Sequence, residues 1–116
     1  VTKLILQSNN NLDTLREEVT KLGYQLTDEI TVNDNNIWYV ICLFKKNENP
    51  KLDDITRKYG LLKKDKQDYY EYIINSKKDI LKKLEKSHDL TLKEQLKTEI
   101  MELTKLLEKC RIISTD

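Results

Sequence analysis

The chain has 116 residues, of which 38% are hydrophobic and 35% are charged. This composition leaves a thin apolar core for the length and favours a divided molecule over a single globule. Its 21 Lys and Arg residues nearly balance its 20 Asp and Glu residues, so net charge alone indicates neither a nucleic-acid nor a membrane partner.

Several functional classes find no support in the residues. The longest apolar run, 37–44, is too short to span a bilayer, so we expect no membrane association and a cytoplasmic location. Cys42 and Cys110 lie far apart and have no His at ligand spacing, which argues against a disulfide framework and a metal site. The single histidine, His88, lies in a predicted turn without catalytic partners and is interpreted as solvated.

The first part of the chain has the pattern of an α/β domain. Residues 3–7 are apolar without alternation, which is typical of a strand covered on both faces in a parallel sheet. Apolar residues at helical spacing then predict a helix over 12–22, with Asn11 as N-cap and Gly23 just after its end. Because a strand-like run follows Val1 almost at once, we expect the remaining strands of this sheet to lie upstream.

A change of pattern follows this helix. Residues 24–32 and 37–44 are rich in β-branched and aromatic residues and predict two strands joined through 33–36 as an antiparallel hairpin. Strand, helix and hairpin in this order are compatible with the end of a Rossmann-like sheet, and with many other α/β domains.

The second part predicts a connector and two helices. Residues 45–66 hold eight basic and four acidic residues, a local charge of 8 − 4 = +4. Beyond them, two apolar stripes at helical spacing predict an antiparallel helical hairpin, a short coiled coil that pairs within one chain and leaves the protein a monomer. The stripes are Tyr70, Ile73, Ile74, Ile80, Leu81 and Leu84, then Leu92, Leu96, Ile100, Leu103, Leu107 and Cys110, and Thr91 to Glu94 fits a capping box at the second helix start.

Charged and aromatic residues of the first of these helices have two interpretations each. Lysines at 77, 78, 82, 83 and 86 recur at helical spacing and could follow a phosphate backbone, but interspersed acids favour a solvated face. Tyr69, Tyr70 and Tyr72 could stack on bases, yet packing is the commoner role at this spacing.

An ordered series of short motifs resembles the bacterial tRNA (adenine-N1)-methyltransferases of the TrmK type. The series runs from Leu4-Ile5-Leu6-Gln7-Ser8-Asn9 through Leu15-Arg16, Leu22-Gly23-Tyr24 and Asp28-Glu29 to the strand 37–44, and then to Tyr59-Gly60-Leu61-Leu62 and the helix 69–84. Ser8 and Leu61 stand where that family has proline.

The resemblance implies a fold and three domains. The fold class is α/β: the C-terminal part of a Rossmann-like methyltransferase sheet, made of strand, helix and antiparallel hairpin, followed by an antiparallel α-helical coiled coil. Residues 1–46 would be the end of the methyltransferase domain, 47–66 a basic connector and 67–116 the helical hairpin.

It also implies a function and a set of site residues. The complete enzyme would transfer a methyl group from S-adenosylmethionine to N1 of an adenine, position 22 in the D-arm of tRNA, while this chain alone would be inactive because most of the cofactor site lies upstream. Gln7, Ser8 and Asn9 would form the pocket rim, since open α/β sheets place ligands at the carboxyl ends of their strands. For Asn9 a purely structural role, at a strand end and as a helix N-cap, is an equal alternative. The expected tRNA-binding residues are Lys45, Lys46, Arg57, Lys58, Lys63, Lys64, Lys66, Lys77 and Lys78.

Two other functions remain open at this point. The chain could be a non-catalytic coiled-coil module whose apolar stripe recruits another protein. It could also belong to a Rossmann-like methyltransferase that acts on a different substrate.

Overall fold

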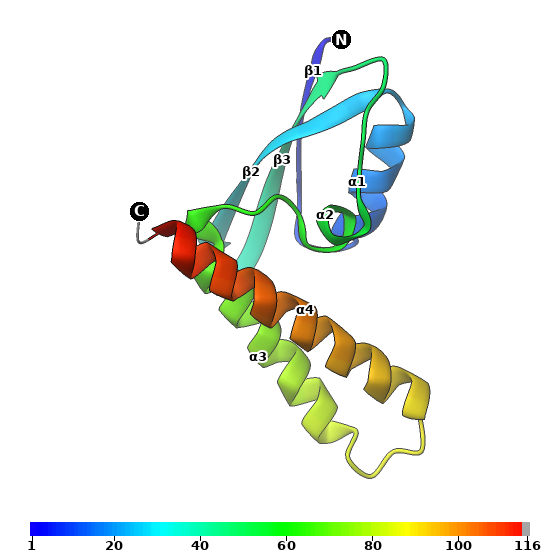
Figure 1. Ribbon diagram of the computed structural model, residues 1–116, viewed down its shortest axis with the longest axis vertical. Coiled ribbons are helices and arrows are strands. Elements are labelled where there is room, and N and C mark those ends of the chain that lie inside the picture. The colour runs from blue at the N-terminus through cyan, green and yellow to red at the C-terminus, as the bar shows by residue number, and fades with distance from the viewer. Residues whose placement is uncertain (115–116) are drawn as a thin grey trace. The chain divides into compact units, whose positions relative to one another are not determined.

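The computed structural model describes residues 1–114 and divides the chain into two units, Val1–Leu61 and Leu62–Asp116. Figure 1 shows the elements, which are β1 (Lys3–Ser8), α1 (Leu12–Lys21), β2 (Tyr24–Asp34), β3 (Ile37–Lys46) and α2 (Asp54–Tyr59) in the first unit, then η1 (Lys64–Lys66), α3 (Gln67–Lys83) and α4 (Leu90–Ser114) in the second. The expected connector 47–66 is therefore shared between the units.

The first unit is built on a three-stranded sheet of order β1-β3-β2. Both neighbouring pairs are antiparallel, so β1 and β2 run in the same direction on either side of β3. This confirms the predicted hairpin of β2 and β3. The expectation that β1 lies in a parallel ladder is not met within the described residues, because its ladder partner there is the antiparallel β3.

The two faces of this sheet differ in burial. One face carries the core residues Leu26, Val40, Cys42 and Phe44, all nearly or fully buried. On the other face, Ile5 is 70% exposed. The prediction that the first strand is covered on both faces is therefore wrong for the chain as the structure describes it, and β1 alternates between exposed and half-buried positions.

An irregularity in β2 turns one charged residue toward the core. The register shifts between Leu26 and Asp28, so that Thr27 is an extra residue in the ladder. Because of this bulge, Leu26 and Glu29 point to the same face although they are three positions apart. Glu29 thereby stands opposite Cys42 and is fully buried.

The turns of the first unit are set by residues with positive φ. Asn35 and Asn36 have φ values of 52° and 66°, which gives a tight two-residue turn instead of the longer 33–36 loop expected. Gly23, at φ 93°, ends α1 as predicted, and its amide donates to the Thr20 carbonyl. Asn11 precedes α1, but its side chain makes no capping hydrogen bond, because its own backbone is left-handed at φ 50°.

The second unit is a hairpin of α3 and α4, which lie side by side and run in opposite directions (Figure 1). Both predicted stripes supply its buried residues, among them Tyr70, Ile74, Leu96, Leu103 and Leu107. Ile80 belongs to the predicted stripe but is 47% exposed.

The second long helix begins at a cap that the sequence analysis missed. Asp89 accepts a hydrogen bond from the amide of Leu92 at 3.0 Å, and α4 starts at Leu90. The capping box predicted at Thr91 to Glu94 is therefore wrong: Thr91 lies inside the helix, and the Asp89 carboxylate accepts from one of the free amides at its start.

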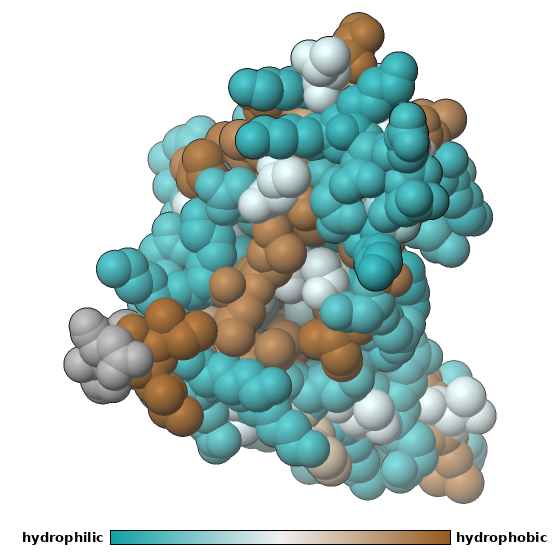
Figure 2. All heavy atoms as spheres, turned by 45° about the horizontal axis from the view of Figure 1, so that its top comes forward, coloured by the Kyte–Doolittle hydropathy of each residue, from teal (hydrophilic) through white to brown (hydrophobic). Residues whose placement is uncertain are grey.

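Hydrophilic side chains cover most of the face drawn in Figure 2, and hydrophobic ones gather there in a few patches. Among the residues that the structure describes, no helix combines the length and the apolar character needed to cross a membrane.

Candidate functional site

A buried ion pair organises the first unit. The Arg16 Nε and Nη2 atoms donate to the two carboxylate oxygens of Glu29 at 2.8 and 3.2 Å, and these side chains are 1% and 0% exposed. Arg16 Nη1 also donates to the carbonyls of Arg57 at 3.0 Å and Lys58 at 3.4 Å. The Cys42 thiol approaches the Glu29 carboxylate at 3.8 Å. One guanidinium therefore joins α1, β2 and the end of α2, in the two-pronged geometry that suits a carboxylate.

Arg16 and Glu29 come from two of the short motifs on which the family resemblance rests, Leu15-Arg16 and Asp28-Glu29. The sequence analysis assigned neither residue a role. The structure shows that these motifs meet, and that Arg16, held by Glu29, also donates to carbonyls of α2.

The expected pocket rim lies where β1 ends. Gln7 and Ser8 are the last residues of β1, opposite Ile41 and Val40 of β3, and Asn9 follows them. Ser8 is tied into the local turn, since its hydroxyl donates to the Asn10 carbonyl at 2.7 Å and accepts from the Asn10 amide at 3.2 Å.

The side chains of Gln7 and Asn9 are exposed. The structural alternative for Asn9 is met only in part: Asn9 lies directly after the end of β1, but the residue at the N-cap position of α1 is Asn11. Both amides are thus displayed together at the carboxyl end of β1, where the sequence analysis placed the rim.

The expected tRNA-binding residues of the first unit differ in how their charge is compensated. Lys45 and Lys46 are exposed at the end of β3. In α2, Arg57 donates to Asp54 at 2.6 Å, and Lys58 lies 3.5 Å from the same carboxylate. The hydrogen bond from Arg57 lowers the pKa of Asp54, and the same bond raises the pKa of Arg57. Among the expected tRNA-binding residues of this unit, Lys45 and Lys46 are therefore more available to a phosphate than Arg57 and Lys58.

The second unit holds the remaining predicted cations, and one of them needs correction. Lys66 is fully buried, with its Nζ atom 5.7 Å from the centroid of the Tyr70 ring. A buried ammonium over an aromatic ring does not reach a phosphate, so we withdraw Lys66 from the tRNA-binding set. Lys64 is exposed and Lys63 is half-buried.

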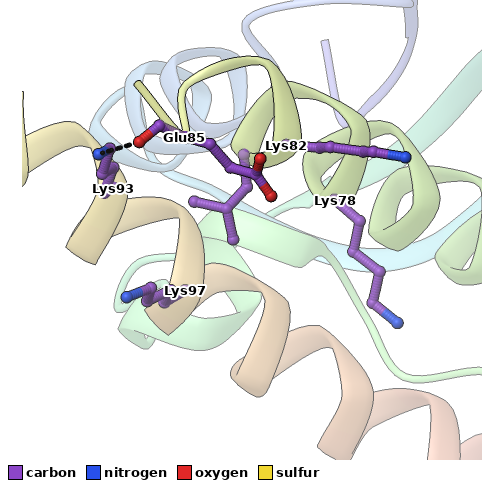
Figure 3. Close-up of a pocket in the computed structure, with 6 residues that line it drawn as sticks. Lys78, Lys82, Glu85, Lys93 and Lys97 are labelled. Carbon is purple, nitrogen blue, oxygen red and sulfur yellow. Dashed lines mark hydrogen bonds between the residues drawn. The ribbon is translucent and has the colours of Figure 1, made fainter. Parts of the chain in front are cut away.

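The two predicted lysines of α3 differ in their surroundings. Lys77 donates to Glu99 of α4 at 2.9 Å and thereby crosslinks the hairpin. Lys78 is exposed and lines a groove together with Leu81, Lys82, Glu85, Lys93 and Lys97 (Figure 3). The sequence analysis did not bring together the lysines of the two helices, although both pairs have i, i+4 spacing.

The other reactive side chains are accounted for structurally. Cys42 and Cys110 are free and buried. Burial raises the pKa of the Cys110 thiol, which donates to the Lys63 carbonyl at 3.1 Å. His88 is exposed in the turn before α4, as predicted. No group of three or more metal-ligating side chains gathers anywhere in residues 1–114.

Solved structures with the same fold cover this chain almost completely. Sp1610 of Streptococcus pneumoniae matches with 20% identity and a TM-score of 0.77, over 92% of this chain and 50% of that one. TrmK of M. capricolum, solved with S-adenosyl-homocysteine, matches with 18% identity and a TM-score of 0.74, over 92% and 49%. The B. subtilis m1A22 tRNA methyltransferase TrmK matches with 18% identity and a TM-score of 0.70, over 90% and 51%.

The chain spans about half the length of each of these structures, and at such identities the likeness establishes the fold. Comparison with curated protein sequences gives no significant match. A family model, described as TrmK: tRNA (adenine(22)-N(1))-methyltransferase, matches residues 1–111. Since that match covers nearly the whole chain, the chain belongs to the TrmK family of tRNA (adenine(22)-N(1))-methyltransferases.

Proposed function

We propose that this chain forms the tRNA-binding C-terminal half of an S-adenosylmethionine-dependent enzyme that methylates N1 of adenine 22 in tRNA. The observation that carries the proposal is the family match over residues 1–111, in a fold shared with one half of the solved TrmK structures. Two other functions were considered. A non-catalytic interaction module has no comparable support, and a methyltransferase acting on another substrate is disfavoured by the description of the matching family.

In this proposal the described residues form the edge of the pocket and do not surround the cofactor. Gln7 and Asn9 present exposed amides at the end of β1, which suit hydrogen bonds to a purine or an amino-acid group. S-adenosylmethionine supplies the activated methyl group when bound. The share of this chain is to orient the base edge at the rim, because positioning and electrostatics are what a protein adds to such a transfer.

The proposed tRNA surface consists of those expected tRNA-binding residues that the structure leaves exposed. In the first unit these are Lys45 and Lys46, and in the second unit Lys64 and Lys78. Lys63 is half-buried and lies next to Lys64 in sequence. Arg57 and Lys58 are paired with Asp54, and Lys77 with Glu99, so these three would contribute less to phosphate binding. We further propose that the α3/α4 hairpin is a short coiled coil, that the protein is a cytoplasmic monomer, and that the domains follow the 1–46, 47–66 and 67–116 division.

The test compares the 116-residue chain with the complete product of its gene. Both are incubated with unmodified tRNA and labelled S-adenosylmethionine, and the methylated nucleotide is located by mass spectrometry. We expect the complete product to methylate adenine 22 at N1, and the chain alone to bind tRNA without transferring a methyl group.

Distinct outcomes would contradict distinct parts of the proposal. Methylation at another nucleotide contradicts the substrate, and methyl transfer by the chain alone contradicts its role as one half of the enzyme. Failure of the chain to bind tRNA, together with capture of a protein partner through the hairpin, would favour the interaction module.

A further inference from the structure

We infer that Arg16 and Glu29 are positioning residues for methyl transfer, because their buried ion pair fixes residues 7–11, here called the rim segment. The inference rests on the proposed function and deepens it, since it names the residues that hold the amides of the expected pocket rim in place. The two side chains are 1% and 0% exposed, so they act on a substrate only through their neighbours.

The ion pair lies in the sheet close to the end of β1. Glu29 of β2 stands opposite Cys42 of β3, and Cys42 stands opposite Leu6 of β1. Two positions further along β1, on the same face, is Ser8, the last residue of the strand. Because a strand rises about 3.3 Å per residue, the row of the sheet that contains Glu29 lies roughly 7 Å from the row that ends at the rim.

Arg16 connects this row to the helix that follows the rim segment. Since α1 begins at Leu12, Arg16 lies little more than one helical turn after the segment. Its Nε and Nη2 atoms bind the Glu29 carboxylate, while Nη1 donates to two carbonyls of α2, those of Arg57 and Lys58. Apolar packing is non-directional, whereas a two-pronged guanidinium contact fixes both distance and direction. The start of α1 is thereby held at one place on the sheet.

The rim segment has little freedom between these two fixed ends. Only residues 9–11 separate β1 from α1. Within this link the Ser8 hydroxyl bonds both the carbonyl and the amide of Asn10, and Asn11 is left-handed at φ 50°. A displacement of α1 therefore moves Asn9 and its side-chain amide as well.

Stability alone does not account for a charged pair at this place. Replacing a buried ion pair by apolar side chains of similar volume is often neutral or stabilising, because two charges no longer have to lose their hydration. Other core positions on the same face are apolar, among them Leu26, Val40 and Phe44. The ion pair adds direction to this core, and a rim that orients a base edge needs direction, since a misplacement of about 1 Å can lower the rate roughly 100-fold.

The test compares three variants of the complete product of the gene. Arg16→Met/Glu29→Leu removes both charges and keeps the site apolar. Arg16→Lys keeps a cation beside Glu29 but cannot form the two-pronged contact. The control, Leu26→Val, shortens a buried side chain at the other end of the same core, opposite Phe44. Methylation of unmodified tRNA gives kcat and KM, and hydrogen exchange followed by mass spectrometry reports on the peptide that covers residues 9–11.

We expect kcat to fall about 10- to 100-fold in the double variant and by a smaller factor in Arg16→Lys. KM for tRNA should stay within about twofold of the wild-type value, because the pair acts on orientation and not on phosphate binding. Exchange of the amides of residues 9–11 should be faster in both variants. In Leu26→Val, kcat and this exchange should keep their wild-type values, although the urea transition followed by Trp38 fluorescence moves to lower concentration.

Several outcomes would overturn the inference while wild-type methylation of adenine 22 stays intact. Wild-type kcat in a folded double variant would show a purely structural pair, and wild-type kcat in Arg16→Lys would show that the pair only neutralises charge. A rise of KM with unchanged kcat would indicate a role in tRNA binding, and an equal fall of kcat in Leu26→Val would indicate stability alone.

The inference stays testable if the double variant does not fold. Arg16→Lys then decides: lower kcat with faster exchange of residues 9–11 supports positioning, and wild-type values of both overturn it. A wild-type complete product that methylates no tRNA would overturn the proposed function, and the inference with it.

Discussion

The two units of the chain are stabilised in different ways. The first unit buries a charged pair, Arg16 and Glu29, whose polar atoms have several specific partners. The second unit buries two apolar stripes that repeat along α3 and α4, and its cross-helix ion pairs, Lys77 with Glu99 and Arg111 with Glu71, remain partly exposed. The first unit therefore adds one specific arrangement of a few polar atoms to its apolar core, whereas the second relies on the sum of many similar contacts.

This difference shows where each unit is sensitive. A buried ion pair stabilises little when intact but costs much when one partner is removed, because the other charge stays in a medium of low polarity. The contact between the apolar stripes of α3 and α4, here called the seam, loses stability in proportion to the side-chain volume that a substitution removes. The single tryptophan, Trp38 in β3, reports on the first unit, and far-ultraviolet circular dichroism is dominated by the long helices of the second.

The largest effect should follow from breaking the ion pair. Arg16→Met leaves Glu29 buried without its cation and frees the carbonyls of Arg57 and Lys58, so we expect a loss of about 3–5 kcal/mol. The transition followed by Trp38 fluorescence in urea should move to much lower concentration, while the helical signal changes far less.

The matched control removes both charges. Arg16→Met/Glu29→Leu keeps a comparable side-chain volume and leaves no buried carboxylate without its guanidinium, so it should recover most of the lost stability. A double variant as unstable as the single one would mean that the bonds to α2, and not the burial of charge, dominate.

A smaller effect is expected from the seam of the hairpin. Leu103 is fully buried, and Leu103→Ala should cost about 2–5 kcal/mol through lost burial and the cavity left behind. Met101 lies in the same helix and is 58% exposed, so Met101→Ala should change stability by less than about 0.5 kcal/mol. Thermal melts followed by circular dichroism compare the two, and equal losses would show that the seam is not the stabilising surface.

The smallest effect concerns the cap of α2 and depends on pH. Asp53 accepts a hydrogen bond from the Thr56 amide at 2.7 Å, which lowers the pKa of Asp53 below its ordinary value of 3.8. The charged cap therefore stabilises the folded state above that value and loses this effect as pH falls through the lower, folded pKa. We expect Asp53→Ala to cost about 1 kcal/mol at neutral pH and nothing in strong acid.

Asp53→Asn separates capping from titration. The amide still accepts the Thr56 bond, so this variant should stay near wild-type stability at neutral pH and lack the acid-dependent part of the loss. Identical pH profiles for wild type and Asp53→Asn would show that the Asp53 charge contributes nothing.

Much of the fold follows from local patterns. The hairpin of β2 and β3 was predicted from its β-branched and aromatic residues, Gly23 from its position after a helical stripe, and the α3/α4 pair from the residues it buries. These features depend on neighbours within a few positions along the chain.

The remaining features depend on residues that meet only after folding. Arg16 lies between Leu15 and Glu17 in an amphipathic helix, and nothing nearby in sequence indicates that it is buried against Glu29. The groove lysines of α3 and α4 are at least 11 positions apart (93 − 82) and become neighbours only when the helices pair. Lys66 was counted as a surface cation because charge alone does not reveal a buried ammonium.

The bulge at Thr27 bears on how this sequence tolerates insertion and deletion. Leu26, Asp28 and Glu29 pair with Phe44, Leu43 and Cys42 in unbroken succession, so Thr27 is the residue that the ladder does not need. Deleting it would leave a regular strand in which Leu26 and Glu29 still face the core, whereas deleting Asp28 or Glu29 would change a paired position. A relative one residue shorter at this point can therefore keep the same buried ion pair, and an alignment that refuses a gap here would match Glu29 with a residue on the wrong face.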